Sequence, residues 1–235
     1  MPVWLGVTDP ARARQTVAHY SRSDFSQPWG VRQTNDPRPE EHVGAYDESN
    51  IWPLFTGSVS LAEYCTGLYK EGFDHLMASL MCYRSATHGR VPEVLRGNAY
   101  RSGGITRHQC WSETAVTGPA IQGMLGWRAD ETAGAVTLAP RLPADWDWIR
   151  VKNLAAGEAR ISLEMEKQPD AVVYTLDGTL PRKVDFSPAL PAGSTVRQVR
   201  LNGKTLDFRT EQIADYTILH LDLPLQGRAV IEITL

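Results

Sequence analysis

A single carboxylate, Glu93, lies in a short stretch whose composition favours a fixed turn. The stretch reads GRVPEVLRGN over residues 89–98, with glycines near both ends and Pro92 directly before the acid. Because proline fixes its own φ angle, such a turn can hold the acid in one place. Two interpretations are open on these residues alone. Glu93 is either a solvated loop acid, as most loop glutamates are, or the acid/base group of an enzyme.

A group of hydrogen-bonding and aromatic residues lies at the start of a predicted helix downstream of this stretch. His108 and Gln109 directly precede that helix and offer hydrogen-bond donors near the loop acid. Glu113 falls one turn into the helix, where it either lines a pocket or is favoured by the helix dipole. Trp111, and Trp52 further upstream, either stack on the apolar face of a sugar ring or pack in the core.

The remaining residues offer no pattern for a metal or a cofactor. The histidines are scattered without metal-ligand spacing, and the Gly103-Gly104 pair lacks the Lys-Ser/Thr of a phosphate loop. No Ser/His/acid arrangement is visible, and Glu63 has the pattern of an ordinary helix residue. Three cysteines are an odd number without CxxC spacing, which predicts buried thiols in a reducing compartment. We therefore expect neither metal nor cofactor.

The first half of the chain has helical periodicity. Asp9 and Pro10 form a helix-start signal. Apolar residues at helical spacing predict further helices over residues 53–70, 72–86 and 108–126. Pro119 should kink or restart the last of them. The segments 22–52 and 87–108 are long, polar and rich in glycine and proline, and long ordered loops tend to be functional.

The second half changes to strands and turns. Period-two alternation predicts strands over residues 160–167, 171–178, 195–201, 216–223 and 229–235. Turn signals lie at Asp177-Gly178, Asn202-Gly203 and Gln226-Gly227, and the second of these predicts a tight hairpin. Many short strands at this spacing indicate an antiparallel β-sandwich. The chain is therefore predicted to be an α+β multidomain protein, helical over 1–130 and a sandwich over 131–235, with the segment LAPRLPADWDW as linker.

Four segments, taken in order, resemble the C-terminal part of six-hairpin glycosidases. They read NIWPLFTGSVSLAEYCTG, VPEVLRG, HQCWSETAVTGPAIQGMLG and LAPRLPADWDWIRVKNLAAGEARISLEMEK, within residues 20–166. The likeness is to the bacterial glycogen-debranching, amylo-α-1,6-glucosidase-like group, with glucoamylases as more distant relatives. That family holds its active site in an (α/α) toroid of paired helices, commonly with a β-sandwich beside it. The resemblance thus implies a partial toroid over 1–130, followed by the sandwich.

The resemblance also implies roles for single residues. In glucoamylase-like enzymes the general base is a glutamate in the loop before the last inner helix, and a Trp-Ser pair opens that helix. Those positions are Glu93 and Trp111-Ser112 here. Inverting hydrolysis pairs such a base with a carboxylic acid roughly 6.5–9.5 Å away. The family's acid lies on an earlier loop without a counterpart in this chain, so the chain alone is expected to be inactive.

One departure from the family falls before the WPLFTG segment. The family reads Tyr-His-Asn-Gly where this chain reads Tyr46-Asp47-Glu48-Ser49. The change alters the expected sugar contacts. It also supplies Asp47 and Glu48 as substitute acids, which the family does not support.

Composition limits the classes of partner. The chain has 235 residues, a net charge of -3, 42% apolar and 22% charged residues, as in ordinary soluble globular proteins. This charge gives no reason to expect a nucleic-acid partner, and no apolar run is long enough for a membrane helix. The N-terminus lacks signal-peptide features, so we predict a cytoplasmic location.

Three functions follow from these observations. The first is the C-terminal part of an inverting glycoside hydrolase acting on α-glucan-type carbohydrates, completed by the missing N-terminal part of the toroid or by a second copy. The second is a non-catalytic truncated or split homologue that acts in carbohydrate binding or assembly. The third, a free-standing carbohydrate-binding sandwich, requires an aromatic platform. The strands after residue 166 offer Tyr174, Phe186, Phe208 and Tyr216 for it.

Overall fold

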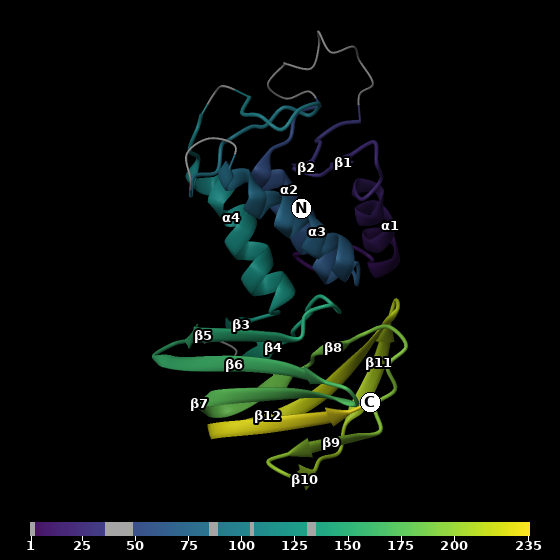
Figure 1. The fold of residues 1–235 in the computed structure, drawn as a ribbon, viewed down its shortest axis with the longest axis vertical. Coiled ribbons are helices and arrows are strands. Elements are labelled where there is room, and N and C mark those ends of the chain that lie inside the picture. The colour runs from purple at the N-terminus through teal and green to yellow at the C-terminus, as the bar shows by residue number, and fades with distance from the viewer. Residues whose placement is uncertain (1–2, 36–48, 85–88, 104–105, 131–134) are drawn as a thin grey trace. The chain divides into compact units, whose positions relative to one another are not determined.

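The computed structural model describes residues 3–35, 49–84, 89–103, 106–130 and 135–235 (Figure 1). The chain divides into two compact units, Met1–Met124 and Leu125–Leu235. In the described residues the first unit is mainly helical and the second is built of strands. The observed boundary precedes the predicted one, because Leu125 and Trp127 are buried in the core of the second unit.

The first unit contains the helices that the sequence predicted, with different ends. They are α1 (Pro10–Tyr20), α2 (Pro53–Cys65), α3 (Tyr69–Met81) and α4 (Cys110–Gly118), followed by the π-helical segment η3 (Pro119–Met124), while the 3₁₀ turn η2 (Cys82–Arg84) extends α3. The side chain of Asp9 caps α1 by accepting the backbone N–H of Arg12 at 3.0 Å, as predicted. Pro119 ends α4, also as predicted. α2 stops at Cys65 because Gly67 adopts a φ of 78° directly after its cap.

Helices α1, α3 and α4 pack around α2. A Cβ atom at Gly57 of α2 would collide with the backbone of Ala115 in α4, so glycine permits their close approach. The short strands β1 (Ser26–Gln27) and β2 (Gly30–Val31) pair antiparallel beside this group. No toroid is evident in the described residues, where the helices gather around α2 without closing a ring.

The second unit is a large sheet. Its strands are β3 (Arg128–Asp130), β4 (Ala135–Leu138), β5 (Trp148–Ala156), β6 (Ala159–Gln168), β7 (Ala171–Phe186), β8 (Ala189–Leu190), β9 (Gln198–Leu201), β10 (Lys204–Thr205), β11 (Arg209–Ile213) and β12 (Tyr216–Thr234). The prediction of a wholly antiparallel sandwich is wrong at one pair, since β4 runs parallel to β7. The β5–β6 hairpin lies between them in the chain and provides the crossover that parallel neighbours need.

Strands β7 and β12 are longer than predicted and pair with each other along most of their length (Figure 1). In one half of the sheet they are flanked by β6 and β9, and in the other half by β4, β8 and β11. The turn signals at Asp177-Gly178 and Gln226-Gly227 do not end these strands. Instead Gly178 and Gly227 pair directly opposite each other, with φ angles of 148° and 98°. The two bends therefore coincide and carry both strands from one half of the sheet to the other. One apolar core, which includes Leu163, Leu176 and Phe186, joins the two halves.

The hairpin predicted at Asn202-Gly203 is confirmed. These residues have φ angles of 48° and 79° and connect β9 to β10. Positive φ at both central positions is the geometry of a type I′ turn, whose twist matches that of paired strands.

Candidate functional site

The loop that carries Glu93 is fixed by backbone hydrogen bonds. Ile51 and Leu95 exchange N–H···O bonds of 3.0 and 2.8 Å, which tie this loop to the residue before Trp52. On the other side of the loop, the N–H of Gly103 donates to the carbonyl of Val94 at 2.7 Å. The stretch is therefore an ordered turn, although no regular helix or strand passes through it.

Gly97 has a structural reason to be glycine. A Cβ atom at this position would collide with the carbonyl of Ser49. The guanidinium of Arg32 donates to the carbonyl of Gly97 through Nε at 3.0 Å and a terminal nitrogen at 2.8 Å. The indole N–H of Trp29 donates to the neighbouring carbonyl of Arg96 at 2.8 Å. These contacts hold the end of the loop against residues 29–32 and close to Ser49.

Glu93 is 5% exposed, so the interpretation as a solvated loop acid is wrong. Its backbone N–H donates to the carbonyl of Thr106 at 3.0 Å. The side-chain nitrogen of Gln109 lies 3.4 Å from Oε1 of Glu93, which is long for a hydrogen bond. Gln109 is itself anchored, because its backbone N–H donates to the carbonyl of Val91 at 2.9 Å. The structure thus brings Glu93 and Gln109 together at the start of α4.

His108 and Glu113 pair with each other. Nδ1 of His108 lies 3.2 Å from Oε1 of Glu113, and both side chains are a little under half exposed. Glu113 is in the first turn of α4, where the helix dipole favours a carboxylate. The pair can offer hydrogen bonds to a ligand at the surface of this helix end.

The two tryptophans of the predicted site differ in exposure. Trp111 is 45% exposed, so of its two alternatives, packing in the core is wrong. Trp52 is partly buried and directly precedes Pro53, the first residue of α2. Ser112, the neighbour of Trp111, is fully buried, and its hydroxyl has no hydrogen-bond partner in the described part of the chain.

A buried polar network was missed by the sequence analysis. Nδ1 of His75 lies 2.7 Å from Oε2 of Glu63, and its Nε2 lies 2.9 Å from Oγ of Ser26. The hydroxyl of Ser21 donates to the other oxygen of Glu63 at 2.8 Å. Glu63 is 0% exposed, so it is not an ordinary helix residue. Burial raises the pKa of Glu63, against the hydrogen bonds from His75 and Ser21, which lower it.

This network joins α2 and α3 to the segment that follows α1. The order hydroxyl, imidazole, carboxylate is that of a nucleophilic triad. A nucleophile also needs an open pocket and oxyanion donors, and the network instead closes on Ser21 at its far end. We therefore assign it to fixing the first unit. The signal in the sequence was an acid among Leu61, Ala62 and Tyr64, which leaves it no polar helix face.

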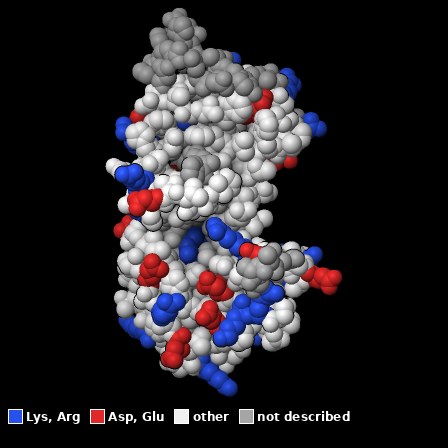
Figure 2. All heavy atoms as spheres, turned by 180° about the vertical axis from the view of Figure 1, so that it is seen from behind, with Lys and Arg blue, Asp and Glu red and all other residues white. Residues whose placement is uncertain are grey.

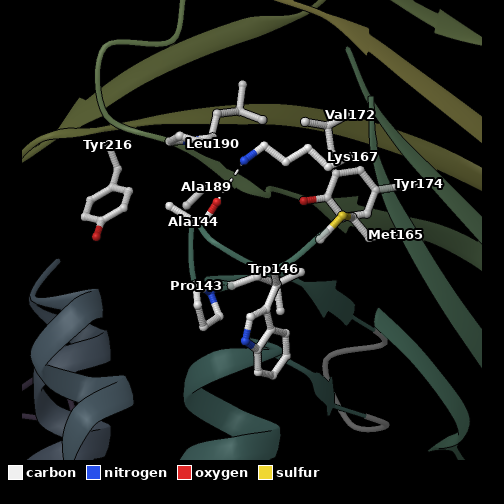
Figure 3. Close-up of a pocket in the computed structure, with 12 residues that line it drawn as sticks. Pro143, Ala144, Trp146, Met165, Lys167, Val172, Tyr174, Ala189, Leu190 and Tyr216 are labelled. Carbon is white, nitrogen blue, oxygen red and sulfur yellow. Dashed lines mark hydrogen bonds between the residues drawn. The ribbon is translucent and has the colours of Figure 1, made fainter. Parts of the chain in front are cut away.

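The second unit has a small hollow between its linker and its strands. It is lined by Trp146, Met165, Tyr174, Leu190 and others, and Lys167 donates to the carbonyl of Ala144 at 2.9 Å (Figure 3). Its volume of about 30 Å³ has room for no more than a few water molecules, so it cannot hold a sugar ring. Burial raises the pKa of Tyr174 beside it.

The described ranges contain neither a metal-binding cluster nor a membrane-spanning helix. There, no three His, Cys, Asp or Glu side chains lie close enough together to bind a metal ion. In the same ranges no helix has the length and apolar character to span a membrane. The thiols of Cys65 and Cys110 are exposed and only Cys82 is buried, so the prediction of buried thiols is wrong for two of the three cysteines.

The chain was compared with known families, curated proteins and solved structures. No family model matches it. No curated protein matches it either. Among solved structures, an α-L-rhamnosidase from Dictyoglumus thermophilum is 11% identical, with a TM-score of 0.53, over 78% of this chain and 21% of that chain. The likeness is one of fold, and this chain spans about a fifth of that protein's length.

Two further solved structures are more distant. The Streptomyces avermitilis α-L-rhamnosidase complexed with L-rhamnose is 11% identical, with a TM-score of 0.37, over 75% of this chain and 21% of that one. A mutant of the Flavobacterium johnsoniae GH31 dextranase complexed with isomaltotriose is 11% identical, with a TM-score of 0.34, over 45% of this chain and 17% of that one. All three neighbours are glycoside hydrolases by name, but scores this low give the last two no weight.

Proposed function

We propose that residues 1–235 are the C-terminal part of an inverting glycoside hydrolase that acts on α-glucan-type carbohydrates, with Glu93 as general base. The observation that carries this proposal is a buried carboxylate on a hydrogen-bonded loop, with Gln109 at its side. A general base must be held within reach of the water it deprotonates, and a fixed loop provides that. The fold likeness to a named α-L-rhamnosidase supports a hydrolase of this kind and leaves the sugar open.

The other residues take supporting roles in this proposal. Gln109 positions the carboxylate of Glu93. Trp111 offers an exposed indole on which a sugar ring can stack, and the His108–Glu113 pair offers donors and acceptors for hydroxyl groups. Trp52 lies at the start of α2, one residue from the backbone bonds that hold the loop.

The catalytic acid belongs to helices upstream of those described, in a toroid that this unit would complete. The alternative acids Asp47 and Glu48 lie outside the described residues. Besides Trp111, the first unit exposes several large hydrophobic side chains, among them Leu80, Tyr100 and Ile121 at 41–42%. Where such side chains form one contiguous patch, they mark a surface that packs against further protein.

Hydrolysis assays on the purified chain test the base. With α-1,4- or α-1,6-linked glucans we expect almost no turnover, because in this proposal the acid that protonates the leaving oxygen lies on helices outside residues 1–235. α-Glucosyl fluoride needs little protonation of its leaving group, so fluoride release above background is expected and should be lost in Glu93→Gln. The exposed Glu158→Gln in the β5–β6 turn is the matched control. Release that is unaffected by Glu93→Gln would end the assignment.

p-Nitrophenyl α-L-rhamnoside should be assayed beside α-glucosyl fluoride, because the fold neighbour is named a rhamnosidase. The anomer released first, followed by NMR, decides between inversion and retention. If the chain alone hydrolyses glucans and this activity disappears in Glu93→Gln, Glu93 remains the general base. The claim that the catalytic acid lies outside residues 1–235 would then be refuted.

A second candidate function is a non-catalytic homologue that binds carbohydrate or assembles with a partner. The exposed side chains of the first unit favour it as much as the first proposal. Light scattering after size exclusion separates the cases. A dimer that dissociates when Trp111 and Ile121 are changed to serine supports assembly through this surface, whereas a monomer that binds no hydrophobic dye argues against it.

A further inference from the structure

The second unit exposes one large hydrophobic side chain in its described residues. This is Trp148, the first residue of β5, which is 69% exposed. In the sequence Trp148 ends the predicted linker, and the aromatic residues considered for a platform lie in later strands. Of those candidates Tyr174 and Phe186 are buried in the core, while Phe208 and Tyr216 are partly buried.

Strand register places Trp148 at one end of a row of side chains on the outer face of the sheet. Trp148 pairs with Glu166 on β6, and Glu166 pairs with Val173 on β7. Val173 pairs with Glu232 on β12, which in turn pairs with Arg200 on β9. With about 4.8 Å between strands, this row extends about 19 Å. Its residues are exposed or half-buried, so the row is an open face.

A second row lies beside the first. Arg150 follows Trp148 by two residues and therefore points to the same side of β5. Its Nε lies 2.6 Å from Oε1 of Glu164, its direct partner on β6. Thr175 of β7 continues this row. The ion pair fixes a guanidinium and a carboxylate next to the exposed indole.

The charges of this face decide what kind of ligand it suits. Acidic and basic side chains are interspersed over the strands of the second unit, as Figure 2 shows for one face. Glu164 and Glu166 would repel a polyanion, and Arg150 and Arg200 would repel a cation. A neutral ligand with many hydroxyl groups can use the carboxylates as acceptors and the guanidinium groups as donors. The flat indole suits the apolar C–H face of a pyranose.

We propose that this face, made by Trp148, Arg150, Glu164 and Glu166, binds a neutral pyranose chain. One ring stacks on Trp148, and the hydroxyls of that ring and the next bond to Glu164, Glu166 and Arg150. Because the row of side chains extends across several strands, the ligand is a chain of several rings lying on the sheet. Because the face is open to solvent, the affinity for this chain is modest. The proposal does not depend on Glu93, since it concerns residues of the second unit alone.

Titration of the full chain with maltohexaose tests this site. Binding is followed by calorimetry and by the indole N–H resonance of Trp148 in NMR, assigned from the Trp148→Ala spectrum. We expect that resonance to shift and Trp148→Ala to weaken binding by about tenfold or more, with Trp148→Phe in between. Trp4→Ala removes a tryptophan that is 37% exposed in the first unit and should leave binding unchanged. Arg150→Met should weaken binding without changing the fold.

Hexagalacturonate, a pyranose chain that carries a carboxylate on each ring, is the matched probe for charge. It should bind more weakly than maltohexaose. Equal binding of the two oligosaccharides, or maltohexaose binding that is unchanged in Trp148→Ala, would overturn the proposal. So would a change of oligomeric state in Trp148→Ala without loss of sugar binding, since the face would then be a contact between protein chains.

Discussion

Changing His75 to alanine removes the partner of a carboxylate that is 0% exposed. Removing one partner of a buried ion pair costs about 3–5 kcal/mol when the remaining group stays charged, and among the described residues only the hydroxyl of Ser21 would still donate to Glu63. Glu63 can avoid the cost by binding a proton, after which the loss falls to about 1–3 kcal/mol for a hydrogen bond and its desolvated partner. The penalty in the free energy of unfolding should therefore depend on pH.

The direction follows from the pKa of Glu63. Burial raises this pKa above its ordinary value of 4.5, so folding favours the protonated acid. The stability that this gives is fully present below 4.5 and is lost as the pH rises through the folded-state pKa. The hydrogen bond from His75 lowers the pKa of Glu63. Without His75 this pKa is higher still, so the loss of stability continues to higher pH. The difference between wild type and His75→Ala should thus grow as the pH rises above 4.5, the ordinary pKa of a glutamate.

Urea unfolding of the full chain at several pH values measures this difference. Far-UV circular dichroism reports mainly on the helices of the first unit, and the transition of the strand-rich second unit serves as the internal control. In the Glu63→Gln background the titrating carboxyl is gone, so the penalty of His75→Ala, measured against Glu63→Gln alone, should no longer grow with pH. A penalty that is constant with pH, or largest in acid, would refute the reasoning.

Two further predictions concern single buried groups. Burial raises the pKa of the Cys82 thiol to about 12, whereas the thiols of Cys65 and Cys110 are exposed. An aromatic disulfide reagent at about pH 8 should therefore react quickly with Cys65 and Cys110 and slowly with Cys82. Three equal rates would contradict this. Ser60 and Ser79 are both fully buried in helices, but only the hydroxyl of Ser60 has a bond, to the carbonyl of Gly72 at 2.6 Å, whereas that of Ser79 has no partner in the described residues. Ser60→Ala should therefore lower the free energy of unfolding by about 1 kcal/mol and Ser79→Ala should leave it unchanged or raise it, as denaturant titration would show; the reverse order would contradict the assignment.

Short sequence motifs were sufficient to predict features that depend only on local backbone geometry, such as helix ends and tight turns. Asp9 and Pro10 start α1, Pro119 ends α4, and Asn202-Gly203 closes a hairpin. The same kind of signal misled at Gly178 and Gly227. A glycine with positive φ serves a turn or a bend equally well, and cross-strand pairing between β7 and β12 decided for a bend.

The candidate site divides in the same way. The sequence by itself singled out Glu93 and its neighbours as candidates, by residue type and resemblance, and it determined the succession of helices and strands. Only the tertiary structure decided that Glu93 is buried beside Gln109, that Glu63 meets His75, and that Trp148 stays exposed. Burial and hydrogen bonding depend on residues tens of positions away in the chain, and no local pattern encodes which of them will be neighbours.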